Sequence, residues 1–366
     1  MKKRFCFPLL LLLSALLFIF PPICFPVDPN SDAQKYLDYQ DGEIKKILLK
    51  GIAASFKENY PFAESSFNLI IQMAPQDPAG YFFKAALYQA QMVDYESDFK
   101  EKDFYENVNL AKLYAQERIK KEKKDAWAYL ILGNSYGAKG LYDARKGNWW
   151  SGLNNGFSAK SALKEALKYD PDLYDAYVGL GSYHYWASIV TKAFWWLPFI
   201  GDHREEGMKE MKLAYEKSIF SSDAAANGLV WIYIQEKKLP FAIDLAQQMQ
   251  FKYPEGKSFL WALAQAYYEK RDWNNALSKY QELLEKIETT KPPNPIPVDQ
   301  FYNLIECRFY IANCFFSMGK YEECATTCQK TLDLSVNDQI KKRQRSKLKS
   351  IQKLLQKSQE FIEKKY

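Results

Sequence analysis

The sequence lacks most of the features on which enzyme active sites are built. Only two histidines, His184 and His203, occur among its 366 residues. The phosphate-binding motif G-x-x-x-x-G-K-[ST] and the zinc-protease motif H-E-x-x-H are both absent. We therefore expect no catalytic residues, no metal site and no cofactor, in a protein that is not an enzyme. His184 replaces an interhelical tyrosine, which predicts a packed, hydrogen-bonded core residue rather than a base.

Cysteines are few and lie near the two ends of the chain. Cys6 and Cys24 lie in the first 27 residues, and the others are Cys307, Cys314, Cys324 and Cys328. In an oxidising compartment Cys314 could form a disulfide with Cys324 or Cys328. Zinc binding is less favoured, because there is no C-x-x-C pair and no histidine nearby. In a third interpretation Cys324 and Cys328 are simply core residues.

Most of the chain has no excess of positive charge, which is concentrated near the C-terminal end. The formal charge is +6, yet residues 338–366 alone contain ten Lys or Arg against three Asp or Glu. The apolar positions of this segment, from Ile340 to Ile362, recur at mostly three- and four-residue steps, as in an amphipathic helix. We expect this basic helix to cap the end of the fold, with contact to an anionic membrane surface as an alternative and no nucleic acid as partner.

The first 27 residues have the layout of an export signal. Lys2, Lys3 and Arg4 precede an apolar run from Leu9 to Phe20, and prolines follow it. The run of 12 residues is short of the roughly 20 that span a bilayer. A cleaved signal, an uncleaved anchor and a lipidated Cys24 stay open. We expect an exported protein that is periplasmic or associated with the cell envelope.

The chain repeats itself in tandem. At an offset of 48 residues, Gly133, Tyr136, Ala159, Leu163, Ala166 and Pro171 match Gly181, His184, Gly207, Met211, Ala214 and Ile219. At an offset of 34 residues, Leu229, Tyr233, Ala242 and Ala246 match Leu263, Tyr267, Ala276 and Tyr280. The shorter offset is the tetratricopeptide spacing, in which each repeat is a pair of antiparallel helices. The sequence therefore predicts an all-α, right-handed superhelix of about seven helical pairs.

The predicted solenoid contains two aromatic insertions. It covers residues 28–290 with about six helical pairs, and each 48-residue copy has extra residues between its two helices, near 141–156 and 187–206. Four prolines then make residues 291–298 an extended connector. A final pair and the basic helix occupy residues 299–366. Because repeat insertions collect on one face of a solenoid, both are expected to project from the same face.

Tryptophan gathers at these insertions, where surface loops rarely contain it. Five of the nine tryptophans lie within residues 149–196. They either pack back onto the repeats or form an apolar site for a partner segment, a lipid or a second subunit. The candidate binding residues are Arg145, Trp149, Trp150, Lys160, Tyr177, Tyr183, Tyr185, Trp186, Trp195, Trp196 and Arg204. Residues 186–200 could also contact a membrane surface, being mostly uncharged.

Three stretches carry a resemblance to a known family. They are ARKGNW at 144–149, YDPDLYDAYVGLGSYHY at 169–185 and LPFIGDHREEG at 197–207. Together with Gly156 and Lys160, they resemble a group of exported bacterial tetratricopeptide proteins. The Leu-Pro and Gly-Asp-x-Arg portion is distantly similar to the eukaryotic tetratricopeptide repeat domain 39 family. The resemblance covers about residues 126–215 and implies a helical scaffold with no known catalytic role.

The function expected from these observations is that of a scaffold. Its concave groove would bind a protein or peptide partner in the cell envelope. A carrier of lipid or another apolar small molecule, using the tryptophan-rich insertions, is the alternative. The fold by itself does not decide between them.

Overall fold

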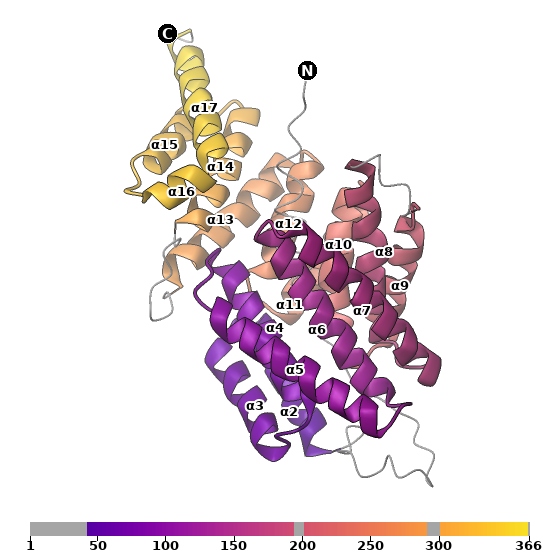
Figure 1. Cartoon of the computed structure of the whole chain (residues 1–366). Helices are drawn as coiled ribbons and strands as arrows, with labels where there is room; N and C mark the ends of the chain where they lie inside the picture. The colour runs from indigo at the N-terminus through magenta and orange to yellow at the C-terminus, as the bar shows by residue number, and fades with distance from the viewer. Residues whose placement is uncertain (1–41, 194–200, 291–300, 365–366) are drawn as a thin grey trace. The chain divides into compact units, whose positions relative to one another are not determined.

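The computed structural model describes residues 42–193, 201–290 and 301–364. The expected export signal at 1–27, the connector at 291–298, and Trp195 and Trp196 lie outside these residues. Within the described ranges every regular element is an α-helix and no strand occurs. This confirms the all-α fold (Figure 1).

The chain divides into two compact units. The first combines the described chain up to Gln91 with Lys100–Ile232, and the second combines Met92–Phe99 with the chain from Tyr233 onward. Along the chain the helices before the second division are α2 (Glu43–Phe56), α3 (Tyr60–Met73), α4 (Pro78–Asp94), α5 (Glu101–Lys121), α6 (Ala126–Arg145), α7 (Trp149–Tyr169), α8 (Ala176–Ala193), α9 (Arg204–Lys217) and α10 (Ser222–Gln235). Those after it are α11 (Leu239–Lys252), α12 (Ser258–Glu269), α13 (Trp273–Thr289), α14 (Tyr302–Ser317), α15 (Tyr321–Leu332), α16 (Asp338–Arg343) and α17 (Arg345–Glu363).

Helices pack mainly on their neighbours in the sequence. Within the first unit α2 contacts α3, α5 contacts α6, α6 contacts α7, and α8 contacts both α7 and α9. The second unit continues the same way from α11 to α15. From α2 to α15 the described residues contain fourteen helices in succession, which matches the seven helical pairs that the sequence predicts. A helical repeat stack buries its apolar faces in this manner, one pair against the next.

One three-residue turn joins the two helices in five of these pairs. Its middle residue has a positive φ in each case, at Glu58, Gly147, Lys237, Arg271 and Gly319. The residue that follows is the N-cap of the next helix, and at Asn59 and Asp272 the side chain accepts a backbone N–H of the first turn. Glycine relieves the strain of this conformation only at Gly147 and Gly319. A shared turn therefore sets the hairpin in short and long repeats alike.

The insertion expected near 141–156 is a longer hairpin and forms no loop. α6 runs to Arg145 and α7 begins at Trp149, so the connection is the same three-residue turn. Small residues let the two lengthened helices stay in contact: a Cβ on Gly140 would come within 3.0 Å of the Gly152 carbonyl oxygen. Nothing larger fits at this close approach. The extra residues thus lengthen both helices, to 20 and 21 residues, compared with 14 residues in each of α2 and α3.

The basic C-terminal helix caps the second unit as the sequence predicts. α17 packs on α14 and α15, and its Ile351 and Leu354 share a core with Cys324 and Cys328. All four cysteines of this region are free, buried thiols. Burial raises the pKa of Cys314 to about 12. The structure therefore agrees with the interpretation of Cys324 and Cys328 as core residues.

The two expected membrane contacts are only partly within the described residues. The structure describes α8 to Ala193, so residues 194–200 of the expected contact lie outside the described residues. On α17, Lys349, Lys353 and Lys357 are exposed. Among the helices that the structure describes, none has both the length and the apolar character that crossing a membrane requires. Contact with a membrane surface stays a prediction.

Candidate functional site

Helix α7 begins with an exposed aromatic stripe. Trp149 and Trp150 occupy its first turn and are 50% and 75% exposed, and Phe157, two turns later, is 47% exposed. Leu153 lies between them at helical spacing and is half-buried. Residues 149, 153 and 157 are four apart and therefore share one face of the helix. We call Trp149, Trp150, Leu153 and Phe157 the α7 stripe.

Tyr183 of α8 continues this aromatic surface. Its ring lies 6.2 Å from the ring of Phe157, and the Lys160 ammonium lies 5.0 Å from its centre. The ring also packs against Gly156, where an added Cβ would lie at an ordinary contact distance of 3.5 Å from it. Burial raises the pKa of the Tyr183 hydroxyl. Lys160 and Tyr183 thus bring a cation and an aromatic ring together beside Phe157.

Two of the candidate residues lie in the core. Tyr185 is fully buried and Trp186 is 6% exposed, and their rings meet edge to face at 4.6 Å. Neither ring is available to a partner at the surface. Their assignment as binding residues was therefore wrong: α8 has neighbours on several sides, so consecutive side chains are both covered.

The remaining described candidates are Arg204, Tyr177 and Arg145, and Arg204 and Tyr177 contact residues outside the α7 stripe. The guanidinium of Arg204 donates two hydrogen bonds to Asp202, at 2.9 and 3.0 Å. Tyr177 is half-buried and stacks on Tyr174 at 6.4 Å. Arg145 lies in the last turn of α6, where a cation complements the helix dipole. Among the candidates that the structure describes, Trp149, Trp150 and Lys160 lie on α7, and Tyr183 lies against it.

A buried carboxylate beneath the α7 stripe holds three helices together. Asp143 of α6 accepts hydrogen bonds from Tyr105 of α5 at 2.6 Å, Lys139 at 2.6 Å and Ser151 of α7 at 2.5 Å. Burial by itself would raise the pKa of Asp143, but the hydrogen bonds outweigh burial and lower it. Ser151 is adjacent to Trp150. The network thus fixes the helix end that carries both tryptophans, a support that sequence patterns did not indicate.

Both histidines of the chain lie together where α8 meets α9. His184 is 4% exposed, and its Nδ1 donates a hydrogen bond to Oε2 of Glu210 at 2.7 Å. His203, the N-cap residue of α9, makes the same kind of bond to Glu206 at 2.9 Å. The two imidazole rings are 5.7 Å apart. The prediction that His184 is packed and hydrogen-bonded is confirmed.

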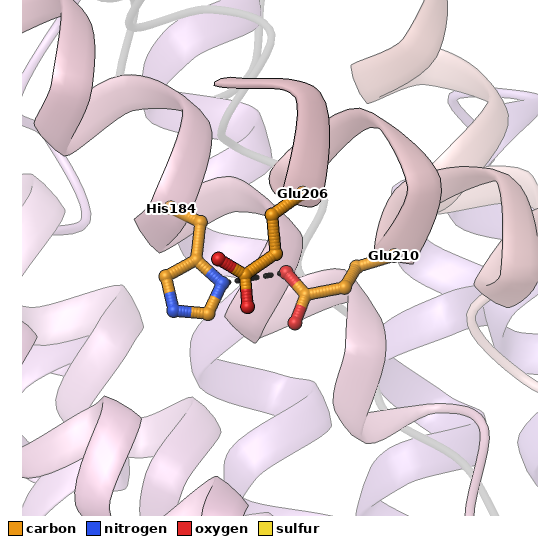
Figure 2. Close-up of side chains that lie close together, drawn as sticks. All are labelled: His184, Glu206 and Glu210. Carbon is orange, nitrogen blue, oxygen red and sulfur yellow. Dashed lines mark hydrogen bonds and ion pairs between the residues drawn. The ribbon is translucent and has the colours of Figure 1, made fainter. Parts of the chain in front are cut away.

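The cluster has the composition of a metal site, which the sequence did not lead us to expect. One ligand atom from each of His184, Glu206 and Glu210 lies within 4.8 Å of the other two. Figure 2 shows Nδ1 of His184 facing both carboxylates. The spacing E-x-x-x-E from 206 to 210 places both carboxylates on one helical face, but it does not include His184 of α8, so the sequence held only part of the signal.

Close contact between two glycines sets this geometry. A Cβ on Gly207 would lie 2.6 Å from the Gly181 carbonyl oxygen and 2.7 Å from the Tyr185 backbone nitrogen. The two helix backbones therefore approach closely at this point. His184 is three residues from Gly181, and Glu206 and Glu210 flank Gly207, so their side chains meet beside the contact.

A pocket of about 490 Å³ adjoins the cluster. It is lined by Asp202, His203, Glu205, Glu206, Lys209 and Glu210. Four carboxylates face one ammonium group there. This chemistry suits a cation and differs from the apolar lining that a lipid would need.

Solved structures of helical repeat proteins are similar to this chain. The APC/C hetero-tetramer Cut9–Hcn1 matches at 13% identity over 89% of this chain, with a TM-score of 0.52. The chain spans 58% of the length of the matched chain. Yeast Tom70 matches at 13% identity over 94% of this chain and 69% of that chain, with a TM-score of 0.43. A thermophilic TPR protein from Thermus thermophilus matches at 16% identity over 62% and 99% of the two chains, with a TM-score of 0.40.

The likeness to Cut9–Hcn1 supports the all-α tetratricopeptide fold and goes no further than the fold. No family model matches the sequence, and no curated protein matches it.

Proposed function

We propose that this protein is a non-catalytic scaffold that binds a segment of another protein, with the α7 stripe as a principal contact. The observation that carries the proposal is the exposure of Trp149 and Trp150, at 50% and 75%, on a helix end that Asp143 holds rigidly. Tryptophan is enriched among the residues that dominate binding energy at protein interfaces. Covering the exposed parts of both indoles would contribute roughly 2 to 4 kcal/mol before the costs of association.

The surface favours an amphipathic partner segment. Leu153 and Phe157 extend the apolar face along α7, and Lys160 lies one turn beyond Phe157. A segment with aliphatic or aromatic side chains on one face and a carboxylate near one end would match this order of apolar and cationic groups. The concave groove expected of the repeats is the proposed path for the rest of the segment.

The proposed location is the cell envelope. Its basis is the basic start of the chain followed by the apolar run Leu9–Phe20. Mass measurement of the protein isolated from its host would test this part: a chain that has lost its first residues, recovered outside the cytosol, supports export. A full-length chain recovered from the cytosol would contradict it.

Site-specific photo-crosslinking in the host tests the scaffold. A photo-reactive amino acid in place of Trp150 should give a discrete adduct with one protein, and Trp149→Ala should reduce its yield. The same probe in place of Phe251, which is 90% exposed on α11, is the matched control and should not give that adduct. Identical adducts at both positions, or none at position 150, would contradict the proposal.

A further inference from the structure

The cluster at the α8–α9 junction brings together all of the imidazole groups in the chain. The sequence contains two histidines, and both form hydrogen bonds to carboxylates of α9. They are 19 positions apart in the sequence and come from two different helical elements. Imidazole nitrogen together with carboxylate oxygen is a common ligand set for divalent transition metals.

Helix stability accounts for only part of this arrangement. Glu205 and Glu206 lie in the first turn of α9, where the helix dipole favours acids. Glu210 lies beyond that turn, and His184 comes from α8. The side chains of His184 and Glu210 nevertheless converge on the carboxylate of Glu206 (Figure 2).

The other 48-residue copy shows that the fold does not require the cluster. The positions equivalent to His184, His203, Glu206 and Glu210 are Tyr136, Asn155, Ser158 and Ala162. The two copies have corresponding interhelical contacts, Gly133 with Leu163 and Gly181 with Met211. Helix packing is thus achieved with no acid and no imidazole at these positions. The titratable groups are an addition of the second copy.

The dimensions are compatible with one metal ion. Ligand atoms of a tetrahedral zinc site lie roughly 3.3 Å apart, given bonds of about 2.0–2.1 Å. The three candidate atoms lie within 4.8 Å, and Glu206 is an exposed side chain that can move. His184 is buried and Glu210 is mostly covered, so two ligands are already in position. Such preparation lowers the cost of ordering the site.

We propose that His184, Glu206 and Glu210 bind a divalent transition-metal ion between α8 and α9, with Zn²⁺ as the representative ion. The metal takes the place of the proton that Nδ1 of His184 shares with Glu210, and that proton moves to Nε2. His203 donates its hydrogen bond to Glu206 and orients this carboxylate, as partners of metal ligands commonly do. The proposal concerns a site separate from the α7 stripe and does not depend on the partner.

Isothermal titration of the full chain with Zn²⁺ tests the site. The protein is prepared without a histidine tag, which would itself bind zinc. We expect saturable binding at one ion per chain. Glu206→Gln should weaken binding at least about 100-fold, because it removes a ligand, whereas loss of an outer partner typically costs about 10–100-fold. His184→Gln should abolish it.

Glu205→Gln is the matched control. Glu205 is exposed in the same helical turn and lines the same pocket, and its substitution changes the charge equally. It should alter zinc affinity by less than about threefold, since exposed charges interact weakly in water. Equal losses in Glu205→Gln and Glu206→Gln would mean diffuse attraction of cations and would overturn the proposal, as would the absence of saturable binding.

Cobalt(II) absorption provides a second readout that does not depend on affinity alone. Co²⁺ bound by nitrogen and oxygen should give weak visible bands that Glu206→Gln removes. An intense near-ultraviolet thiolate band would place the metal at the cysteines and contradict the assignment. Because His184 is buried, circular dichroism must show that His184→Gln retains its helices; the exposed Glu206→Gln variant carries the test if it does not.

Discussion

The two 48-residue copies have corresponding interhelical contacts and use the surrounding positions differently. In α6/α7 the contact is Gly133 with Leu163, and in α8/α9 it is Gly181 with Met211. The first copy places tryptophans outward at the end of its hairpin, while the second buries Trp186 and gathers both histidines of the chain. The comparison teaches that the repeat determines which positions meet, and that the side chains at those positions determine what the copy can do.

The largest expected difference concerns tryptophan. Trp186→Ala should lower the free energy of unfolding by about 3–5 kcal/mol, because a buried indole leaves a large cavity. The equivalent position in the first copy is Ala138, which is also buried. Urea denaturation followed by far-ultraviolet circular dichroism measures the change. A loss below about 1 kcal/mol would mean that the second copy does not depend on this ring.

The glycine contact gives the next largest effect. Gly207→Ala should destabilise the protein by about 2–3 kcal/mol, because its Cβ would press on the backbone atoms of Gly181 and Tyr185. The first copy has Ala159 at the equivalent position, so the helix backbones there leave room for a methyl group. The reciprocal control, Ala159→Gly, should cost only about 1 kcal/mol from backbone entropy. Equal effects would show that the two hairpins are equally close and would remove this part of the comparison.

The sequence predicted well those contacts that form within one helical hairpin. The offset of 48 residues correctly paired Gly133 with Gly181 and Leu163 with Met211, because contacts within a helical hairpin follow from helix periodicity. The number of helical pairs and the capping role of α17 followed in the same way. Periodicity also favoured His184 as a packed residue, which its burial confirms.

What the sequence did not show depends on contacts between elements. Tyr185 and Trp186 are adjacent and both buried, which a one-faced helix would not allow, because α8 is covered on more than one side. Continuation of α6 to Arg145 depends on its close approach to Gly152 of α7. The metal-ligand cluster joins His184 to Glu206 across a hairpin, so no local motif contains it. The export signal, the partner and the membrane contacts stay predictions.

Two buried carboxylates give the two copies opposite responses to pH. Hydrogen bonds keep the pKa of Asp143 below its ordinary value of 3.8, so its stabilising effect is present above that value and is lost as pH falls through the lower, folded pKa. Burial raises the pKa of Asp175 to about 7, although the backbone N–H groups of residues 219–221 oppose this rise. Its contribution is therefore greatest below the unfolded value and declines as pH rises from about 4 to 7.

Asp143→Asn measures the first of these responses. At pH 7 it should lower the free energy of unfolding by about 1–3 kcal/mol, because the bonds from Tyr105, Lys139 and Ser151 lose a charged acceptor. The difference from the wild-type protein should stay constant from pH 8 to 5 and shrink below about pH 4. Asp175→Asn is the control, since it should change the pH dependence only between about 4 and 7. A difference that is independent of pH in both variants would contradict these assignments.

The smallest expected effect on stability separates a binding surface from a structural one. Because Trp149 and Trp150 are exposed, the double change Trp149→Ala with Trp150→Ala should alter the free energy of unfolding by less than about 0.5 kcal/mol, in contrast to Trp186→Ala. Urea denaturation of the purified protein measures this. A loss above about 2 kcal/mol would show that the indoles support the hairpin itself, and the exposed pair would then have a structural role like that of the buried tryptophan. A neutral result combined with loss of the crosslinked partner would assign the same two residues to recognition, because a side chain that contributes little to the isolated fold and much to a complex acts through the interface.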